Sequence, residues 1–159
     1  MTAPKVPIRV LATNRKASHD FHIHERFEAG IALVGSEVKS LRAAKVTMAD
    51  GWVEIKKGQA YLHGIQINEY SQANRWQHDV GRVRKLLMHR HEIDKLATKT
   101  LIKGYTLIPL QLYFKGSKVK VELGLVTHKK QHDKRQDKRA ADARREIDRA
   151  ISQRTKGKA

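Results

Sequence analysis

The sequence predicts a domain that is mainly β with a few helices, followed by a basic tail. Three observations carry this prediction: short apolar segments alternate with turn residues, two pairs of these segments have hairpin spacing, and the composition changes at His128. The 159 residues suffice for one core plus an extension. The pattern leaves open whether the antiparallel sheet closes into a small barrel or forms an open α+β sandwich.

The first predicted elements lie between residues 20 and 44. Asp20–Glu28 alternates apolar and polar residues with a period near two, which indicates a strand. Glu28-Ala29-Gly30 is predicted to break it, and Ile31–Val34 is predicted to form a second, short strand. Ser36 is then expected to cap a helix whose apolar face includes Val38.

Two hairpins supply the other four of six predicted strands. Trp52–Ile55 and Tyr61–Ile65 flank the turn-like residues 56–59. Tyr105–Phe114 and Lys118–Val126 flank a second turn that contains Gly116. Alternating side chains on both hairpins favour an antiparallel arrangement.

Between the hairpins we expect a polar loop and one further helix. Ser71–Gly81 lacks any hydrophobic period, which is typical of a loop. His89–Lys99 places Ile93 and Leu96 on one side of a predicted helix, which ends before Gly104.

The charge of the chain predicts a polyanionic partner. Lys and Arg number 33 against 16 Asp and Glu, which gives a net charge of +17 and a pI near 10.3. Such a surface binds phosphates with release of counterions. A membrane-binding role would need a basic amphipathic helix with large apolar residues opposite the cations, and the sequence contains no convincing example.

The absence of cysteine excludes several kinds of site. Without Cys the chain has no disulfide, no thiolate nucleophile and no Cys-rich zinc site. Residues 1–15 contain no apolar run of the length that a signal peptide needs. We therefore expect a protein that is not exported and resides in the cytoplasm.

The tail, residues 128–159, is predicted to be a separate region. It contains 12 Lys and Arg against 5 Asp and Glu, with Ile147 and Ile151 as its larger apolar residues, four positions apart. So narrow an apolar stripe stabilises an isolated helix poorly. Our hypothesis is that the tail is largely disordered in the free protein and becomes helical on ribosomal RNA.

Four segments taken in order resemble the SmpB family. They are Asn14-Arg15-Lys16-Ala17 with His19-Asp20-Phe21; Phe27-Glu28-Ala29-Gly30-Ile31 with Gly35 to Arg42; Arg84-Lys85-Leu86-Leu87; and Gly124-Leu125-Val126 leading to His132-Asp133-Lys134-Arg135. Together they span about residues 12–139 and are far more specific than any one short motif. Among the positions that depart from the family pattern, His89 stands where Asn is common, and His128 stands where Gly is usual.

The resemblance implies a fold and a function. The fold would be a closed, six-stranded antiparallel barrel like an oligonucleotide-binding (OB) fold, with about three helices, over residues 1–127. The function would be to bind the transfer-RNA-like domain of transfer-messenger RNA and to deliver it to stalled 70S ribosomes. The tail would occupy the decoding region and the empty messenger channel, next to small-subunit RNA. We expect a monomer that needs no cofactor.

Cations and family positions together give the candidate binding residues. A phosphate-binding face is predicted from Arg15, Lys16, Lys39, Arg42, Arg82, Arg84, Lys85, Lys118 and Lys120. The resemblance adds Asn14, Glu28 and Leu87, together with Lys129 and Lys130 at the junction with the tail. Glu28 would accept from a base or a 2′-hydroxyl, orient a neighbouring cation, or form an ordinary ion pair.

The tail carries its own candidates for the ribosome. These are His132, Asp133, Lys134, Arg135, Ile147 and Ile151. An imidazole can stack on a base while the two cations contact phosphates. A plain solvated charge run is the alternative interpretation.

Other functions fit the sequence less well. Lys103-Gly104-Tyr105 is similar to the start of an RNA-recognition motif, but Pro109 interrupts the pattern that should follow. A nuclease would need a catalytic constellation, and no nucleophile elbow, phosphate-cradling loop or carboxylate cluster is present. His22 and His24 share a strand face as two metal ligands would, but no third ligand is evident. We therefore expect a binding protein without catalytic or metal-binding residues.

Overall fold

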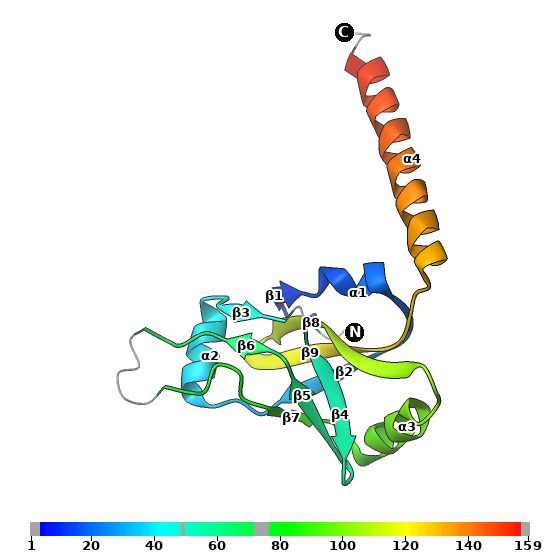
Figure 1. Ribbon diagram of the computed structural model, residues 1–159. Helices are drawn as coiled ribbons and strands as arrows, with labels where there is room; N and C mark the ends of the chain where they lie inside the picture. Colours follow the sequence, from blue (N-terminus) through cyan, green and yellow to red (C-terminus); the bar gives the residue numbers. More distant parts are fainter. Residues whose placement is uncertain (1–3, 49, 72–76, 157–159) are drawn as a thin grey trace. The chain divides into compact units, whose positions relative to one another are not determined.

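A computed structural model describes residues 4–48, 50–71 and 77–156 of the chain. The chain divides into two compact units, Met1–Thr127 and His128–Ala159, and each is described by itself. Within the described residues the helices are α1 (Arg15–Asp20), α2 (Gly35–Arg42), α3 (Arg90–Thr100) and α4 (Gln131–Lys156) (Figure 1). The strands are β1 (Ile8–Thr13), β2 (Phe21–Ile31), β3 (Val46–Thr47), β4 (Trp52–Lys56), β5 (Gln59–His63), β6 (Gln66–Ile67), β7 (Arg84–Leu87), β8 (Tyr105–Lys115) and β9 (Lys118–His128).

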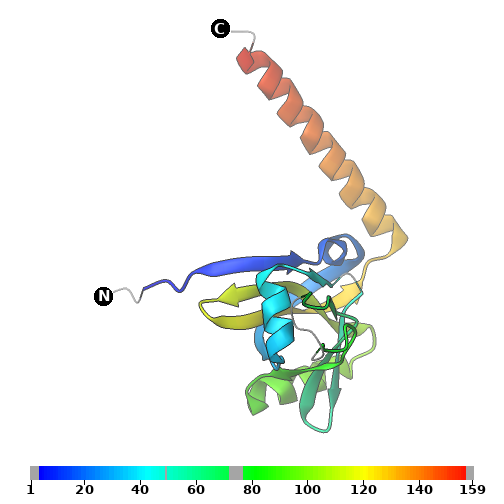
Figure 2. The same ribbon diagram turned by 90° about the vertical axis from the view of Figure 1, so that its left-hand side faces the viewer.

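Seven strands of the first unit form one curved sheet in the order β1-β8-β9-β2-β7-β5-β4. β3 and β6 pair separately, next to α2 (Figure 1). β1, the first strand of the chain, runs along β8 at one edge of the sheet (Figure 2). The sheet curls until β4 approaches β8, but no hydrogen-bonded ladder joins these two strands.

The expectation of a closed six-stranded barrel is therefore wrong. The described sheet has seven strands, and β1 and β4 are its two edges. Mainly antiparallel β structure with helices is confirmed, with four helices in place of about three. The OB-like description stays a prediction.

The hairpin predictions are confirmed. Trp52 pairs with His63 and Lys56 pairs with Gln59 across the turn between β4 and β5. Lys57 and Gly58 both have positive φ, +50° and +69°, which is the conformation that a two-residue hairpin turn requires. β8 pairs with β9 over almost their full lengths.

Three predictions between residues 28 and 36 are wrong. Gly30 does not break the strand, because β2 continues to Ile31 and Gly30 pairs with Leu87 of β7. The strand expected at Ile31–Val34 therefore does not exist beyond Ile31. Ser36 does not cap α2, since the Val34 amide donates to Glu37 Oε2 at 3.1 Å in the first turn. Of the loop expected at Ser71–Gly81, residues 72–76 lie outside the described residues.

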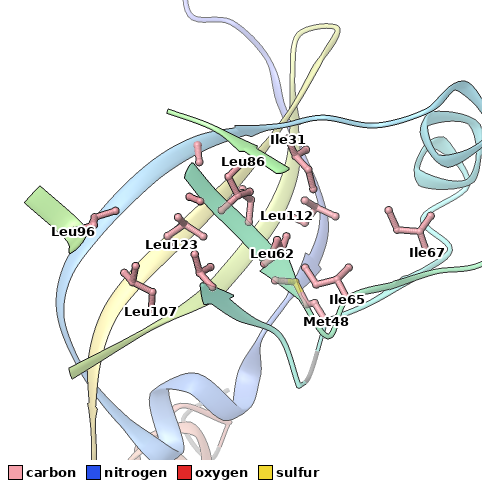
Figure 3. Packing of buried hydrophobic residues seen from close by; sticks show 14 of the residues in the cluster. Ile31, Met48, Leu62, Ile65, Ile67, Leu86, Leu96, Leu107, Leu112 and Leu123 are labelled. Atoms are coloured by element: carbon pink, nitrogen blue, oxygen red, sulfur yellow. The ribbon is translucent and has the colours of Figure 1, made fainter. Parts of the chain in front are cut away.

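Apolar side chains fill the interior of the curved sheet. Leu62, Leu86, Leu107, Leu112 and Leu123 come from four different strands and meet in one cluster (Figure 3). Leu96 of α3 joins them, as the sequence predicted for its buried face. Burial of this area is the main stabilising contribution to the fold.

A buried ion cluster lies beside this core. Glu37 of α2 and Arg84 of β7 are both fully buried, with 3.1 Å between Glu37 Oε1 and Arg84 Nε. The Arg84 guanidinium also donates to the carbonyls of Ile65, Arg82 and Val80 at 2.8–3.2 Å. Arg82 donates to both Glu37 oxygens, at 3.0 and 2.9 Å. A buried charge is tolerated when it is paired and hydrogen-bonded in this way.

The second unit contains one long helix, α4. The structure describes Gln131–Lys156 as helical, and the hypothesis that this segment is largely disordered in the free chain and becomes helical on ribosomal RNA stays a prediction. The Lys130 amide donates to Asp133 Oδ2 at 3.3 Å, which satisfies one of the free amides at the helix start. Further along, Arg145 pairs with Asp142 at 3.7 Å. Such local pairs add helical stability that the apolar pattern alone does not show.

Replacing Glu37 with Gln should destabilise the first unit strongly. The substitution leaves Arg84 charged and buried without its carboxylate, which costs about 3 kcal/mol in the free energy of unfolding. Chemical denaturation of the full chain measures it. The matched control is Glu122→Gln, which removes a partly exposed pair with Arg26 and should cost less than about 1 kcal/mol. Equal losses in the two variants would contradict the structural role of Glu37.

The same cluster predicts a pH dependence of stability. Burial alone would raise the pKa of Glu37, but hydrogen bonds from Arg82 and the Val34 amide, with the charges of Arg84 and Arg82, hold it below its usual 4.5. The carboxylate therefore stabilises the folded state above pH 4.5, and this contribution disappears as the pH falls through the lowered folded pKa. Between about pH 5 and pH 3, the unfolding free energy of Glu37→Gln should fall less steeply than that of the wild type. Parallel pH profiles would contradict this assignment.

Candidate nucleic-acid interface

A pocket of about 660 Å³ on the sheet brings together four of the predicted binding residues. Glu28 comes from β2, Lys85 and Leu87 from β7, and Lys120 from β9. His89 and Glu92, at the start of α3, complete one side of its wall. We call this pocket, with its lining side chains, the sheet pocket.

Strand register explains why these residues meet. In the sheet order β9 lies beside β2 and β2 beside β7, so the three strands are adjacent. Gly30 is paired with Leu87, two residues from Glu28, and Glu28 therefore lies on the same side of the sheet as Leu87. On β7 the buried Arg84 and Leu86 alternate with the exposed Lys85 and Leu87.

Leu87 is exposed although it is apolar. Its exposed fraction is 55%, whereas that of its neighbour Leu86 is 1%. A Cβ atom added at Gly30 would lie 3.2 Å from Leu87 Cβ, so glycine at that position leaves the pocket floor open. An exposed leucine that shares a pocket with two lysines is suited to packing against a ribose or an unstacked base.

Glu28 is held by neighbours on β8. The Tyr113 hydroxyl donates to Glu28 Oε2, and Lys115 Nζ lies 3.2 Å from Glu28 Oε1. The hydrogen bond from Tyr113, aided by Lys115 and by the charge of Lys120, holds the pKa of Glu28 below its usual range despite partial desolvation. Desolvation and the hydrogen bond to Glu28 raise the pKa of Tyr113, which keeps its hydroxyl a neutral donor. The ion pair foreseen for Glu28 is thus present, with Lys115 as its partner, and its role in orienting a cation or accepting from RNA stays a prediction.

A second pocket, of about 520 Å³, contains Asn14, Arg15 and Lys16. Asn14 is buried: its backbone amide donates to Leu110 O at 2.8 Å and its Nδ2 donates to Pro109 O at 3.0 Å. These carbonyls lie at a bulge of β8, where Pro109 and Gln111 interrupt the register. Asn14 therefore fixes the start of α1 on the sheet, and the side chains exposed to a ligand are Arg15 and Lys16.

The other cations expected on this face are spread around it. Arg42 lines a smaller pocket, about 350 Å³, beside Arg9 and the turn between β8 and β9. Lys39 Nζ lies 5.7 Å from the centre of the Tyr70 ring, in a cation–π arrangement. Lys118 is exposed at the start of β9.

The prediction that Arg84 contacts RNA is wrong. Arg84 has no exposed surface, and its guanidinium is occupied by Glu37 and three backbone carbonyls. Arg82, also expected on the phosphate-binding face, is bound to Glu37. Arginine side chains are mostly exposed, so the sequence suggested that Arg82 and Arg84 contact phosphates. The charge of a residue does not show whether its side chain is buried.

In the tail, the predicted residues lie on or just before α4. Lys129 forms an ion pair with Asp137, and Lys130 contributes its backbone amide to Asp133. His132 and Arg135 are exposed in the first turns of the helix, and Lys134 is half-buried. Ile147 and Ile151 are both 60% exposed and share one helical face.

Tyr113 and His89 are among the lining or supporting residues that sequence reasoning did not assign to the site. Tyr113 is paired with Lys120 across the β8–β9 hairpin. The turn at Gly116 sets the register of the hairpin, so the pairing of Tyr113 with Lys120 could have been predicted from the sequence. The hydrogen bond from Tyr113 to Glu28 could not have been predicted in this way. His89 lines the sheet pocket as the residue just before α3.

Residues 4–48, 50–71 and 77–156 contain no group of three or more His, Asp or Glu side chains placed to bind a metal ion. Among the same residues, every helix is too short or too polar to cross a bilayer.

Comparisons with known proteins agree on one family. The family described as SmpB protein matches residues 11–153. The SsrA-binding protein of Bacillus velezensis is 50% identical over 154 residues, which cover 97% of this chain and 99% of that protein. The SsrA-binding protein of Carboxydothermus hydrogenoformans is 50% identical over 143 residues, or 90% and 96% of the two chains.

A solved structure is similar as well. It is described as "tmRNA-SmpB: a journey to the center of the bacterial ribosome" and shares 45% identity with this chain. The match covers 76% of this chain and 85% of that one, with a TM-score of 0.64. With nearly full-length matches in sequence and a shared fold, the chain belongs to the SmpB family.

Proposed function

We propose that this chain binds the transfer-RNA-like domain of transfer-messenger RNA and delivers it to stalled ribosomes. The observation that carries the proposal is the sheet pocket, which brings Glu28, Lys85, Leu87 and Lys120 together from three strands. Two cations, one exposed apolar side chain and an oriented carboxylate suit a folded RNA that presents phosphates and an unstacked nucleotide. Relatives named SsrA-binding protein, and a neighbour described with tmRNA and the ribosome, support this partner.

The two units would have separate tasks. The first carries the sheet pocket, and Arg15 and Lys16 beside Asn14 would extend its contacts along the RNA backbone. The second, with its long basic helix, would lie in the decoding region and the empty messenger channel of the small subunit. There His132 and Arg135 would contact ribosomal RNA, while Ile147 and Ile151 would pack against an apolar or base surface.

The proposed activity is binding without chemistry. A general acid or base works best with a pKa near the working pH, and the pKa of Glu28 is shifted away from neutrality by Tyr113 and Lys115. The Glu92 carboxylate beside it accepts from the His89 amide at 3.2 Å and so serves the start of α3. The protein would act by shape and charge, as one monomer that occupies space normally filled by codon pairing.

Replacing Lys120 or Lys85 with Ala should weaken binding to the transfer-RNA-like domain. Each change removes one phosphate contact, so affinity should fall about five- to tenfold and the slope of log K against log salt should decrease by about one. Filter binding or fluorescence anisotropy at several salt concentrations measures both quantities. Lys103→Ala, an exposed lysine outside the three pockets, is the matched control. An equal loss in the control would show that only total charge matters.

Removing α4 should separate RNA binding from ribosome rescue. A chain that ends at Lys130 retains all of β9 and the sheet pocket, so its affinity for the transfer-RNA-like domain should stay within about threefold of the full chain. Tagging of stalled nascent peptides in a reconstituted translation system should be lost. Full tagging by the shortened chain would contradict the role proposed for α4.

A further inference from the structure

A stacked aromatic pair lies on the hairpin that borders the sheet pocket. The Trp52 and His63 rings are nearly parallel, at 8°, with their centres 4.2 Å apart. Trp52 is 46% exposed although it is the largest apolar side chain of β4. No part of the function proposed above uses this pair.

Neighbouring residues of the hairpin hold the Trp52–His63 pair in place. Trp52 and His63 are partners in the β4–β5 register, and His63 Nε2 lies 3.0 Å from Glu54 Oε2. Because the imidazole covers one face of the indole, the indole is held in one orientation while much of its surface stays open. A rigid, half-exposed ring loses little conformational entropy when a ligand packs on it.

The pair continues the surface of the sheet pocket. Gln59, Tyr61 and His63 alternate with the buried Ala60 and Leu62 on β5, so these three side chains share the outer side of the strand. Gln59 lines the sheet pocket. Tyr61 is paired with Lys85 on one side and with Glu54 on the other. One strand therefore connects the pocket with the aromatic pair.

From this arrangement we infer that the exposed face of Trp52 stacks on an unpaired nucleobase of the RNA held in the sheet pocket. The inference rests on the proposed function, because it assumes that the pocket binds RNA. Every nucleobase has a π-face, and aromatic side chains next to cations are a common platform for unstacked bases. The nearest cations along these strands are Lys85, which is paired with Tyr61 two residues from His63, and Lys56, which lies on the same side of β4 four residues from Trp52. The Glu54 carboxylate between Trp52 and Lys56 is paired with His63.

The charge of the chain disfavours the main alternative occupant, a second copy of the same chain. Each copy carries a net charge of +17, so two copies would repel each other at this face. An RNA ligand has the opposite charge and gains from the same cations.

Two substitutions at Trp52 test the inference in the full-length chain. Trp52→Leu keeps apolar area but removes the π-face, and should weaken binding to the transfer-RNA-like-domain transcript about tenfold. Because stacking releases no counterions, this factor should be the same at about 0.05 M and 0.2 M salt, unlike the factor for Lys120→Ala. Trp52→Phe keeps a stacking ring and should stay within about threefold of the wild type. Thermal unfolding of each variant checks that the hairpin remains folded.

A second readout does not depend on the Leu variant. The chain has two tryptophans, and Trp76 lies outside the described residues, so Trp76→Phe leaves Trp52 as the single indole. Its fluorescence should be quenched as the transcript is added, because base stacking quenches indole emission. An unbent RNA duplex of equal length, which offers no unpaired base, should quench it far less.

The outcomes separate this inference from the function on which it rests. If Trp52→Leu binds the transcript normally and Trp52 emission is unchanged, while Lys120→Ala still weakens binding, the pocket binds RNA and the stacking inference is wrong. If the wild-type chain sediments as a dimer and Trp52→Leu as a monomer, a second copy covers Trp52 and the inference is also overturned. If the wild-type chain binds the transcript no more tightly than an RNA duplex of equal length, the proposed function itself is refuted.

Discussion

The inward position of Arg84 is the constraint on which the rest of the surface depends. Its guanidinium donates to Glu37 of α2 and to three backbone carbonyls. These four partners fix the position of the Arg84 side chain in the core. Because side chains alternate along a strand, fixing Arg84 inward also turns Lys85 and Leu87 outward. A shift of β7 by one residue would bury these two and expose Arg84. A buried ion pair is a poor source of net stability, but here it sets the register of β7.

The sheet pocket is thus a product of register in three neighbouring strands. Gly30 opposite Leu87 keeps the pocket open, and Tyr113 paired with Lys120 reaches the Glu28 carboxylate from β8. A carboxylate beside phosphates is unfavourable by itself. Here the Glu28 carboxylate accepts from Tyr113 and pairs with Lys115. Under the proposed function, Lys85 and Lys120 would then be left for the RNA. Selectivity would come from this fixed pattern, because net charge alone attracts any polyanion.

The sequence predicted what local patterns encode. Both hairpins, α3 and the change of composition at His128 follow from period and turn chemistry. Of the candidate residues in the sheet pocket, Lys85 followed from the charge pattern, Glu28 and Leu87 from the resemblance, and Lys120 from both. β1 and β7 were missed because an edge strand and a four-residue strand have too little periodicity. Arg84 was misplaced because nothing local shows that Glu37, 47 residues away, neutralises it in the core. The open edge between β1 and β4 is likewise a tertiary property.

The central claim, that RNA is bound at one defined face of the sheet, is tested most directly by lysine footprinting. The full chain is acetylated with and without the transfer-RNA-like-domain transcript, and modification of each lysine is measured by mass spectrometry. The account predicts that Lys85 and Lys120 become protected, whereas Lys103, exposed outside the pockets, stays reactive. Equal protection of all exposed lysines would contradict the account. Strong protection of Lys103, with Lys85 and Lys120 unchanged, would also contradict it.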